Sequence, residues 1–276
     1  MDTSAFFDRL PTIFPGDPQD TDPVDPYWDE VKADVTGFTS SNELAALHLA
    51  ASLLPKDEVY LEVGTFKGRS LCGVVRDNTT TTFYAMENFL EFGMAGQEAR
   101  AELMGNLDRY AAHADVRLLE GDCFDLMVKP GSLDRPVGVY FYDGEHTLLA
   151  HYLALALVEP LLADEALVLV DDATWPVVQR AHRWFLKRNP GWSIEATWDA
   201  KVDDDPRWAN GLHVLRFVRT APSRLSRVTR VLRWYQATLQ APLNKLFWSV
   251  GSRLPESAKS AIRRAFASSR GVEAGD

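Results

Sequence analysis

Short runs of β-branched and aromatic residues alternate along this chain with longer segments of helical periodicity. Five of these runs end in polar residues, and the last two lie close together in the sequence. Runs of this length and composition predict β-strands, here at residues 59–63, 81–87, 116–120, 137–142, 166–170, 192–198 and 211–218.

The segments between the strands predict helices at residues 44–54, 69–77, 97–112, 146–158 and 177–187. Ser40 and Glu43 have the spacing of a capping box before the first of them. The alternation favours a doubly wound, mostly parallel seven-stranded sheet with helices on both faces. No convincing helix separates the last two strands, so we expect them to form an antiparallel hairpin.

Composition divides the chain into three parts. Residues 1–36 are rich in Asp and Pro, which predicts an extended lead-in that is partly ordered at best. Residues 37–220 hold all the predicted strands and form the expected domain. Residues 221–276 form a basic segment with the pattern of an amphipathic helical tail.

A glycine turn follows the first strand and carries the strongest local signal. Gly64 can take a positive φ and lets a ligand approach the backbone closely. Gly68 opens a predicted helix whose first amide groups have no internal partner, which favours an anion. Glu62 places a negative charge beside the same turn. The free amide groups could bind an anionic group and Glu62 could bind a cationic one, so the turn suits a zwitterionic ligand. The alternative is a tight turn that binds no ligand.

Acidic residues end the next two strands. Glu87 lies at roughly the interval after the glycines at which nucleotide-binding α/β folds place a ribose-binding carboxylate. Asp122 follows Gly121 after the third strand, where it could accept a hydrogen bond from a base or form a local turn. The carboxyl ends of parallel strands meet at one edge of the sheet, so these residues predict a ligand site there.

With these motifs the chain resembles the class I S-adenosylmethionine-dependent methyltransferases. Within them it is similar to the group with an Asp-Gly-x-His motif after the fourth strand, of the macrocin and sugar O-methyltransferase type. The resemblance covers residues 37–218 and rests on the segments 62–68, Glu87, 121–122, 143–146 and 171–172. One departure is the segment 163–165, where these enzymes often have a Gly-Gly turn.

The resemblance implies a Rossmann-like methyltransferase fold and an O-methyltransferase activity on a hydroxyl of a small acceptor, of the sugar or natural-product type. It also implies a set of residues that bind S-adenosylmethionine: Glu62, Gly64, Thr65, Gly68, Ser70, Glu87, Asp122, Cys123 and Asp143.

The chemistry at the fourth and fifth strands allows two interpretations. Asp143, Asp171 and Asp172 would repel one another unless a cation intervened, and oxygen ligands suit Mg²⁺. Metal-dependent O-methyltransferases that are similar to this chain use such a triad to hold two substrate oxygens. The alternatives are that Asp171 bonds backbone amides and that Asp172 caps a turn. His146 is the rival catalytic residue, since histidine suits proton removal near neutral pH, and a packing or capping role is its alternative. The two schemes can also coexist, with the metal orienting the substrate and His146 taking the proton.

Composition excludes several classes of protein and bears on location. The net charge of −10 argues against general nucleic-acid binding. Two cysteines, Cys72 and Cys123, do not suggest a disulfide framework, and we expect no signal peptide from the first residues, so a cytoplasmic location is expected. Trp175, Trp198 and Trp208 fall near the expected site, where aromatic walls would fit an aryl or sugar acceptor.

The tail reverses the charge of the rest of the chain. Residues 222–276 hold ten Lys or Arg and three Asp or Glu, a net +7, whereas the remaining residues carry −17. Its apolar positions fall on one helical arc, at Leu225, Val228, Val231, Leu232, Tyr235 and Leu239. An aromatic-rich patch follows at Leu243, Leu246, Phe247, Trp248 and Val250. Residues 222–250 could pack on the domain or a second subunit, or lie peripherally on an anionic membrane.

Two other functions compete with methyl transfer. One is a noncatalytic nucleotide-binding module that docks to a partner or a membrane through the basic tail. Against it, the acidic residues after the fourth and fifth strands would have no purpose in a scaffold. The other is an NAD-dependent oxidoreductase, but the turn from Gly64 to Gly68 lacks the dinucleotide-binding spacing.

Overall fold

The computed structural model describes residues 1–90, 94–202 and 205–251, and gives the backbone alone for residues 94–95 and 247–251. All seven predicted strands are present in one sheet of order β3-β2-β1-β4-β5-β7-β6. Their bounds are β1 Val59–Val63, β2 Thr82–Glu87, β3 Asp115–Glu120, β4 Val137–Tyr142, β5 Leu162–Val170, β6 Trp192–Trp198 and β7 Leu212–Val218.

The sheet is parallel from β3 to β5 and antiparallel at its other edge. β7 lies between β5 and β6 and runs antiparallel to both, which confirms the predicted terminal hairpin. β5 begins four residues earlier than expected because segment 163–165 belongs to the strand. The order of β1, β4 and β5 brings the ends of β4 and β5 side by side, with Tyr142 opposite Val170.

Ten α-helices surround this sheet among the described residues. They are α1 Thr3–Arg9, α2 Tyr27–Asp34, α3 Ser41–Ser52, α4 Arg69–Val74, α5 Met94–Tyr110, α6 Cys123–Val128, α7 Leu148–Val158, α8 Pro176–Leu186, α9 Arg227–Tyr235 and α10 Ala241–Gly251. A π-helical turn, Gln236–Gln240, joins the last two, and short 3-10 turns lie at Leu10–Thr12 and Glu159–Leu161. None of the described helices is long and apolar enough to span a bilayer.

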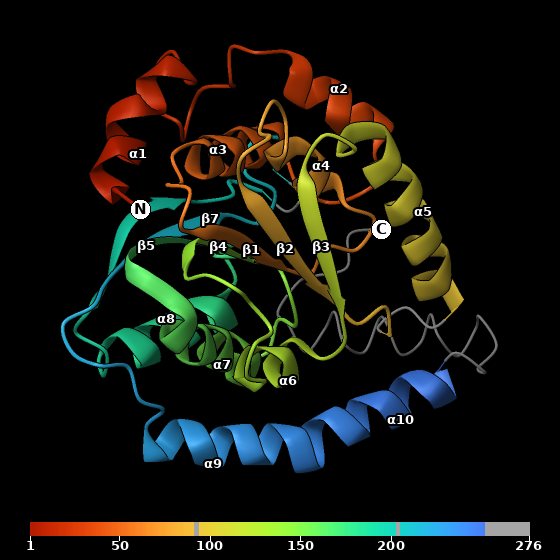
Figure 1. Ribbon diagram of the computed structural model, residues 1–276, viewed down its shortest axis with the longest axis vertical. Helices are drawn as coiled ribbons and strands as arrows, with labels where there is room; N and C mark the ends of the chain where they lie inside the picture. Colours follow the sequence, from red (N-terminus) through yellow and green to blue (C-terminus); the bar gives the residue numbers. More distant parts are fainter. Residues whose placement is uncertain (91–93, 203–204, 252–276) are drawn as a thin grey trace.

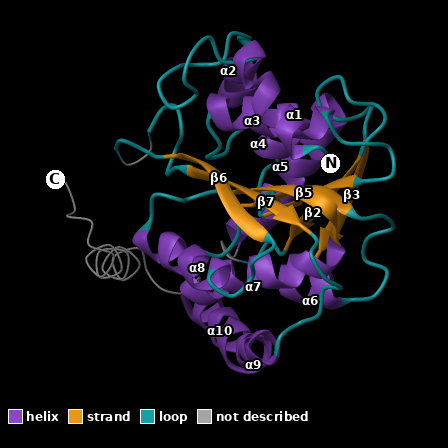
Figure 2. Cartoon of the chain, turned by 90° about the vertical axis from the view of Figure 1, so that its left-hand side faces the viewer, coloured by secondary structure: helices purple, strands orange, loops and turns teal. Residues whose placement is uncertain are grey.

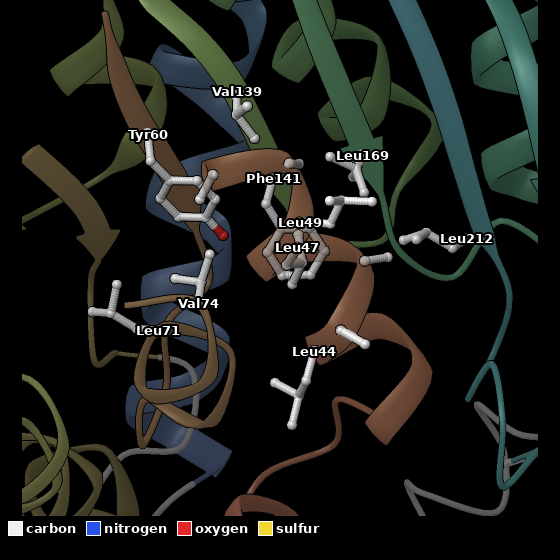
Figure 3. Close-up of a cluster of buried hydrophobic side chains, with 14 of the residues drawn as sticks. Leu44, Leu47, Leu49, Tyr60, Leu71, Val74, Val139, Phe141, Leu169 and Leu212 are labelled. Carbon is white, nitrogen blue, oxygen red and sulfur yellow. The ribbon is translucent and has the colours of Figure 1, made fainter. Parts of the chain in front are cut away.

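The helices form a layer on each face of the sheet (Figures 1 and 2). α1 to α5 cover one face, and α6 to α8 cover the other. Alternation along the strands decides which side chain meets which layer. On β1, Tyr60 packs with the first layer, and Leu61 packs with the second. Figure 3 shows part of the first cluster, which includes Leu44 and Leu47 of α3 and Val139 and Phe141 of β4.

The first 36 residues differ from the expected extended lead-in because they contain α1 and α2. Asp2 caps α1 by accepting from the amides of Ser4 and Ala5. Phe6 of α1 and Val31 of α2 are fully buried in the first core cluster. A few large apolar side chains therefore anchor a segment whose Asp and Pro content predicts disorder.

Candidate functional site

A cavity of about 240 Å³ lies at the carboxyl ends of β1, β2, β3 and β4, where the polar residues of the sequence pattern meet. The tail forms its remaining wall. Its lining comprises Phe38, Val63, Gly64, Phe66, Met86, Glu87, Asn88, Leu90, Gly121, Asp122, Cys123, Phe124, Asp143, Gly144, Glu145, His146, Gln236, Ala241, Asn244 and Lys245. Five of the nine predicted cofactor residues thus reach the wall: Gly64, Glu87, Asp122, Cys123 and Asp143.

The ends of β1 and β4 approach each other so closely that position 64 has no room for a side chain. The φ of Gly64 is +91°, and a Cβ on it would lie 1.9 Å from the carbonyl oxygen of Asp143. The same approach places the Gly64 backbone and the Asp143 side chain on one wall. Gly68 has a φ of +86° and precedes α4, as predicted, although α4 has only six residues.

Four of the predicted cofactor residues lie outside the cavity lining. Glu62 is fully buried and accepts hydrogen bonds from the hydroxyls of Thr65 at 2.7 Å, Tyr60 at 3.1 Å and Ser70 at 3.3 Å. Burial raises the pKa of Glu62 to about 7, and these hydroxyls limit the rise. Glu62, Thr65 and Ser70 therefore stabilise the glycine turn through a buried hydrogen-bond network. Direct contact with a cofactor stays a prediction for these three residues and for Gly68.

Glu87 binds the loops that border the cavity. One carboxylate oxygen accepts from the amide of Phe66 at 2.9 Å, and the other accepts from Asn88 at 2.7 Å and Phe89 at 3.0 Å. Phe66 and Phe89 both have positive φ, near +50°. Each carboxylate oxygen can accept more than one hydrogen bond, so Glu87 retains capacity for ligand hydroxyls at the wall.

Asp122 has the turn-forming role that the sequence left open. It caps α6 by accepting from the amides of Phe124 at 2.9 Å and Asp125 at 3.3 Å. Its second oxygen accepts from the side-chain amide of Gln236, at 3.3 Å. Asp122 and Cys123 also line the cavity, so the cap places them beside any bound ligand.

His146 and Asp172 form a contact across the ends of β4 and β5. Nδ1 of His146 lies 2.7 Å from Oδ2 of Asp172, at ion-pair distance but without the angles of a hydrogen bond. His146 precedes α7 instead of opening it as predicted, since Thr147 is the N-cap. The Trp175 and His146 rings form a T-shaped contact, with centroids 5.1 Å apart. Asp172 has a φ of +57°, a strained conformation of the kind that clusters at functional sites.

The acidic residues at β4 and β5 divide into two groups. The potential ligand atoms of Asp143, His146 and Asp172 all lie within 4.8 Å of one another. Burial raises the pKa of Asp143 well above its usual range, and repulsion from Asp172 raises it further. The structure thus brings His146, instead of the predicted Asp171, to Asp143 and Asp172.

Asp171 turns away from this group toward α3. Its carboxylate accepts from the amide of Asp172 at 2.7 Å, the backbone role left open by the sequence. Burial raises the pKa of Asp171 well above its usual range, and repulsion from the carboxyl of Glu43 on α3 raises it further. Burial raises the pKa of Glu43 to about 7. The backbone amide of Asp172 therefore occupies one oxygen of Asp171, and metal binding by Asp171 stays a prediction that the observed geometry does not favour.

The tail contributes residues that the sequence analysis did not assign to the site. Gln240 donates to Glu145 at 2.6 Å, and Asn244 approaches the same carboxylate at 3.4 Å. Arg233 pairs with Asp125 beside the Gln236 contact. The spacing of Gln236, Gln240 and Asn244 by four residues, along one border of the apolar arc, was the available signal.

The expected tryptophan wall is only partly present. Trp175 lies beside His146, whereas Trp198 and Trp208 stack on each other with centroids 4.3 Å apart in the buried core. The Trp208 indole donates to the carbonyl of Pro18 and so ties the N-terminal segment to the domain. Phe38, which stacks on Phe66 at the cavity, is the aromatic residue that the sequence analysis missed.

Comparisons with known proteins agree with this geometry. Residues 61–173 match the family model of a methyltransferase domain. No curated protein matches the chain. Among solved structures, an O-methyltransferase from Bacillus cereus in complex with SAH is similar at 16% identity and a TM-score of 0.53, covering 71% of this chain and 92% of that one.

A second solved structure is an O-methyltransferase from Streptomyces achromogenes, TomG, involved in tomaymycin synthesis and in complex with SAM. It is 18% identical, has a TM-score of 0.50, and covers 78% of this chain and 95% of that one. At such identities the likeness establishes the fold, and the matched domain spans β1 to the end of β5, where the cavity lies. Residues 61–173 therefore match a methyltransferase domain, and the chain has the fold of the similar O-methyltransferase structures.

Proposed function

We propose that the chain transfers the methyl group of S-adenosylmethionine to a hydroxyl oxygen of a small acceptor of the sugar or natural-product type. The observation that carries the proposal is the contact of His146 with Asp172 at the wall of the cavity. A general base at this wall could remove the proton of an acceptor hydroxyl and so make its oxygen a better nucleophile. The similar proteins from Bacillus cereus and Streptomyces achromogenes, both O-methyltransferases, support the same reaction class.

The cavity suits the methyl donor by charge and by hydrogen bonding. Glu87, Asp122 and Asp143 line it, and among the described residues of its wall the only Lys or Arg is Lys245 of the tail. This excess of carboxyl groups favours a cationic ligand, and S-adenosylmethionine carries an ammonium and a sulfonium group. Glu87 would accept from the ribose hydroxyls, and Asp122 would accept from the adenine amine.

His146 would act as the general base in this reaction. Nδ1 faces Asp172, so Nε2 is the nitrogen available to accept the proton of the acceptor hydroxyl. The acceptor oxygen then forms a bond to the methyl carbon, and the carbon–sulfur bond breaks with its electron pair left on sulfur. The nearby carboxylate of Asp172 would stabilise the protonated form of the imidazole. Alignment of the donor and the nucleophile provides much of the remaining rate.

A divalent cation is a second candidate because of the group formed by Asp143, His146 and Asp172. Two carboxylates and an imidazole fit such an ion, and a cation would relieve the repulsion that raises the pKa of Asp143. When bound, the ion would hold the acceptor hydroxyl and make it more acidic. A histidine that ligates the ion through Nδ1 would lose its contact with Asp172. The two schemes therefore assign different roles to His146.

Two measurements test the proposal. Calorimetry should show binding of S-adenosylmethionine, and a screen of hydroxylated acceptors should show donor consumption with transfer to oxygen. Binding without consumption across sugars, phenols and other hydroxyl compounds would favour the noncatalytic module. Exhaustive chelation separates the two schemes: unchanged turnover identifies His146 as the sole base, whereas loss that Mg²⁺ reverses identifies the cation.

A further inference from the structure

The two sides of the C-terminal helices face different surroundings. α9, the π-helical turn and α10 lie along the outside of the helix layer formed by α6, α7 and α8 (Figures 1 and 2). On the inner side, Leu225 and Leu232 pack against the second core cluster, and Gln236 is 2% exposed. The segment is therefore docked on the domain, which accounts for only part of its apolar arc.

The outer side carries a continuous stripe of exposed apolar residues, which no other part of the described chain covers. Its members are 45–64% exposed and follow one another at three- or four-residue intervals apart from the adjacent pair 234–235: Val228, Val231, Trp234, Tyr235, Leu239, Leu243 and Leu246. We call these seven residues the outer stripe. At a rise of about 1.5 Å per residue, 19 helical residues extend roughly 28 Å.

The charge of this segment identifies the partner that it fits. Residues 222–251 hold four Arg, one Lys and no acidic residue, whereas residues 1–221 carry a net −17. Arg233 pairs with Asp125, but Arg224, Arg227 and Arg230 are exposed and form no ion pair within the described part of the chain. Lys245 is also exposed, on α10. A basic border beside an apolar stripe is complementary to anionic headgroups above an acyl layer.

The aromatic residues of the outer stripe favour the same partner. Trp234 is 62% exposed and Tyr235 is 46% exposed. Rings with an apolar body and a polar end concentrate at the boundary between headgroups and hydrocarbon. A second copy of the chain is a poorer occupant, since stripe-to-stripe contact would bring two segments without acidic residues together.

We propose that the outer stripe docks on an anionic membrane surface, with α9 and α10 parallel to the bilayer plane. Ala241, Asn244 and Lys245 line the cavity from α10, while Leu243 and Leu246 of the same helix belong to the stripe. Docking therefore places the cavity wall next to the membrane. The proposal concerns binding alone and does not depend on methyl transfer.

Vesicle flotation with the full chain tests the proposal. Vesicles with about one third phosphatidylserine or phosphatidylglycerol should carry the protein at low salt, whereas neutral phosphatidylcholine vesicles should carry little. Raising the salt to roughly 0.5 M should weaken binding because it shortens the screening length below about 5 Å. Absence from anionic vesicles at low salt overturns the proposal, and so does equal binding to neutral and anionic vesicles.

Matched variants locate the surface. The double variant Trp234→Ser and Leu243→Ser should lower the partition coefficient on the order of tenfold or more, because each buried methylene contributes to binding. Val24→Ser and Val202→Ser, at positions 63% and 62% exposed and outside the stripe, provide the control and should bind as the unmodified protein does. Equal loss in both double variants overturns the assignment of the stripe.

Size-exclusion chromatography with light scattering tests whether a second copy of the chain covers the outer stripe instead. The unmodified chain should have the same mass as the Trp234→Ser, Leu243→Ser variant in the absence of lipid. A dimer that this variant dissociates would assign the stripe to a second copy and overturn membrane docking. Donor binding by calorimetry should be unchanged in both double variants, which separates this test from that of the proposed methyl transfer.

Discussion

Nδ1 of His146 lies 2.7 Å from Oδ2 of Asp172, although the two residues come from different strand ends. β4 and β5 are neighbours in the sheet, so the residues that follow them meet at one edge. The loop that contains Asp172 holds that residue at a φ of +57°. The contact therefore depends on the parallel order of two strands and on one strained residue.

Asp172→Asn should keep the backbone, because Asn tolerates a positive φ, but should lose the charge that orients His146. We expect kcat to fall about 10²- to 10⁴-fold, the usual contribution of general-base catalysis, with little change in donor affinity. His146→Gln should have a similar effect. His113→Gln, at an exposed histidine, is the matched control. Full turnover in both Asp172→Asn and His146→Gln would show that the base lies elsewhere.

Glu87→Ala should weaken binding of S-adenosylmethionine by roughly 1–3 kcal/mol, because charged hydrogen bonds are lost. Calorimetry measures the change directly. Glu120→Ala is the matched control, since Glu120 lies opposite Glu87 in the β2–β3 register and pairs with Arg100 on the surface. An equal effect of the two substitutions would contradict a ribose contact by Glu87.

Gly64→Ala should destabilise the fold and distort the cavity. The new Cβ would lie 1.9 Å from the Asp143 carbonyl, at a φ of +91°, and the backbone strain alone costs about 1–3 kcal/mol. Gly105→Ala in α5 should instead stabilise by about 0.4–1 kcal/mol, because a Cβ there has nothing within 4 Å. Denaturant unfolding should place the two variants on opposite sides of the unmodified protein, and a Gly64→Ala variant of undiminished stability would contradict the close approach.

Three buried histidines should make the fold sensitive to acid. Burial lowers the pKa of His151 to about 3 and that of His213 to about 4, and it lowers the pKa of His182 well below its ordinary value. The unfolded chain binds these protons near pH 6.5, whereas the folded chain does not. Their contribution to stability is therefore complete above pH 6.5 and is lost as the pH falls toward 4.

His151→Phe isolates one of these groups while retaining a ring against Tyr142. Between pH 6.5 and pH 4 the free energy of unfolding of the unmodified protein should change more steeply than that of the variant. The difference approaches about 1.4 kcal/mol per pH unit for one proton. Buried carboxyls with raised pKa, such as Glu62, act in the opposite direction, but they are common to both proteins and cancel in the comparison. Parallel curves would contradict a neutral buried His151.

The sequence by itself determined the sheet and the location of the site. Each strand is an apolar run whose side chains alternate between two cores, and this periodicity is local, so residues such as Tyr60 and Leu61 reveal it without a tertiary context. The polar residues after β1 to β4 identified the cavity wall, because parallel strands end at one edge. Glu87 and Asp122 were found in this way.

The tertiary structure decided which polar groups meet. Asp171 and Asp172 are adjacent in sequence, yet Asp172 contacts His146 whereas Asp171 accepts from a backbone amide and feels the charge of Glu43 on α3, and no local pattern encodes such a choice. The helices of the first 36 residues were missed because their stability comes from burying Phe6 and Val31 against α3 and the sheet, not from composition. The inner face of the tail became part of the site for the same reason: Gln240 reaches Glu145 only because α9 packs on the helix layer.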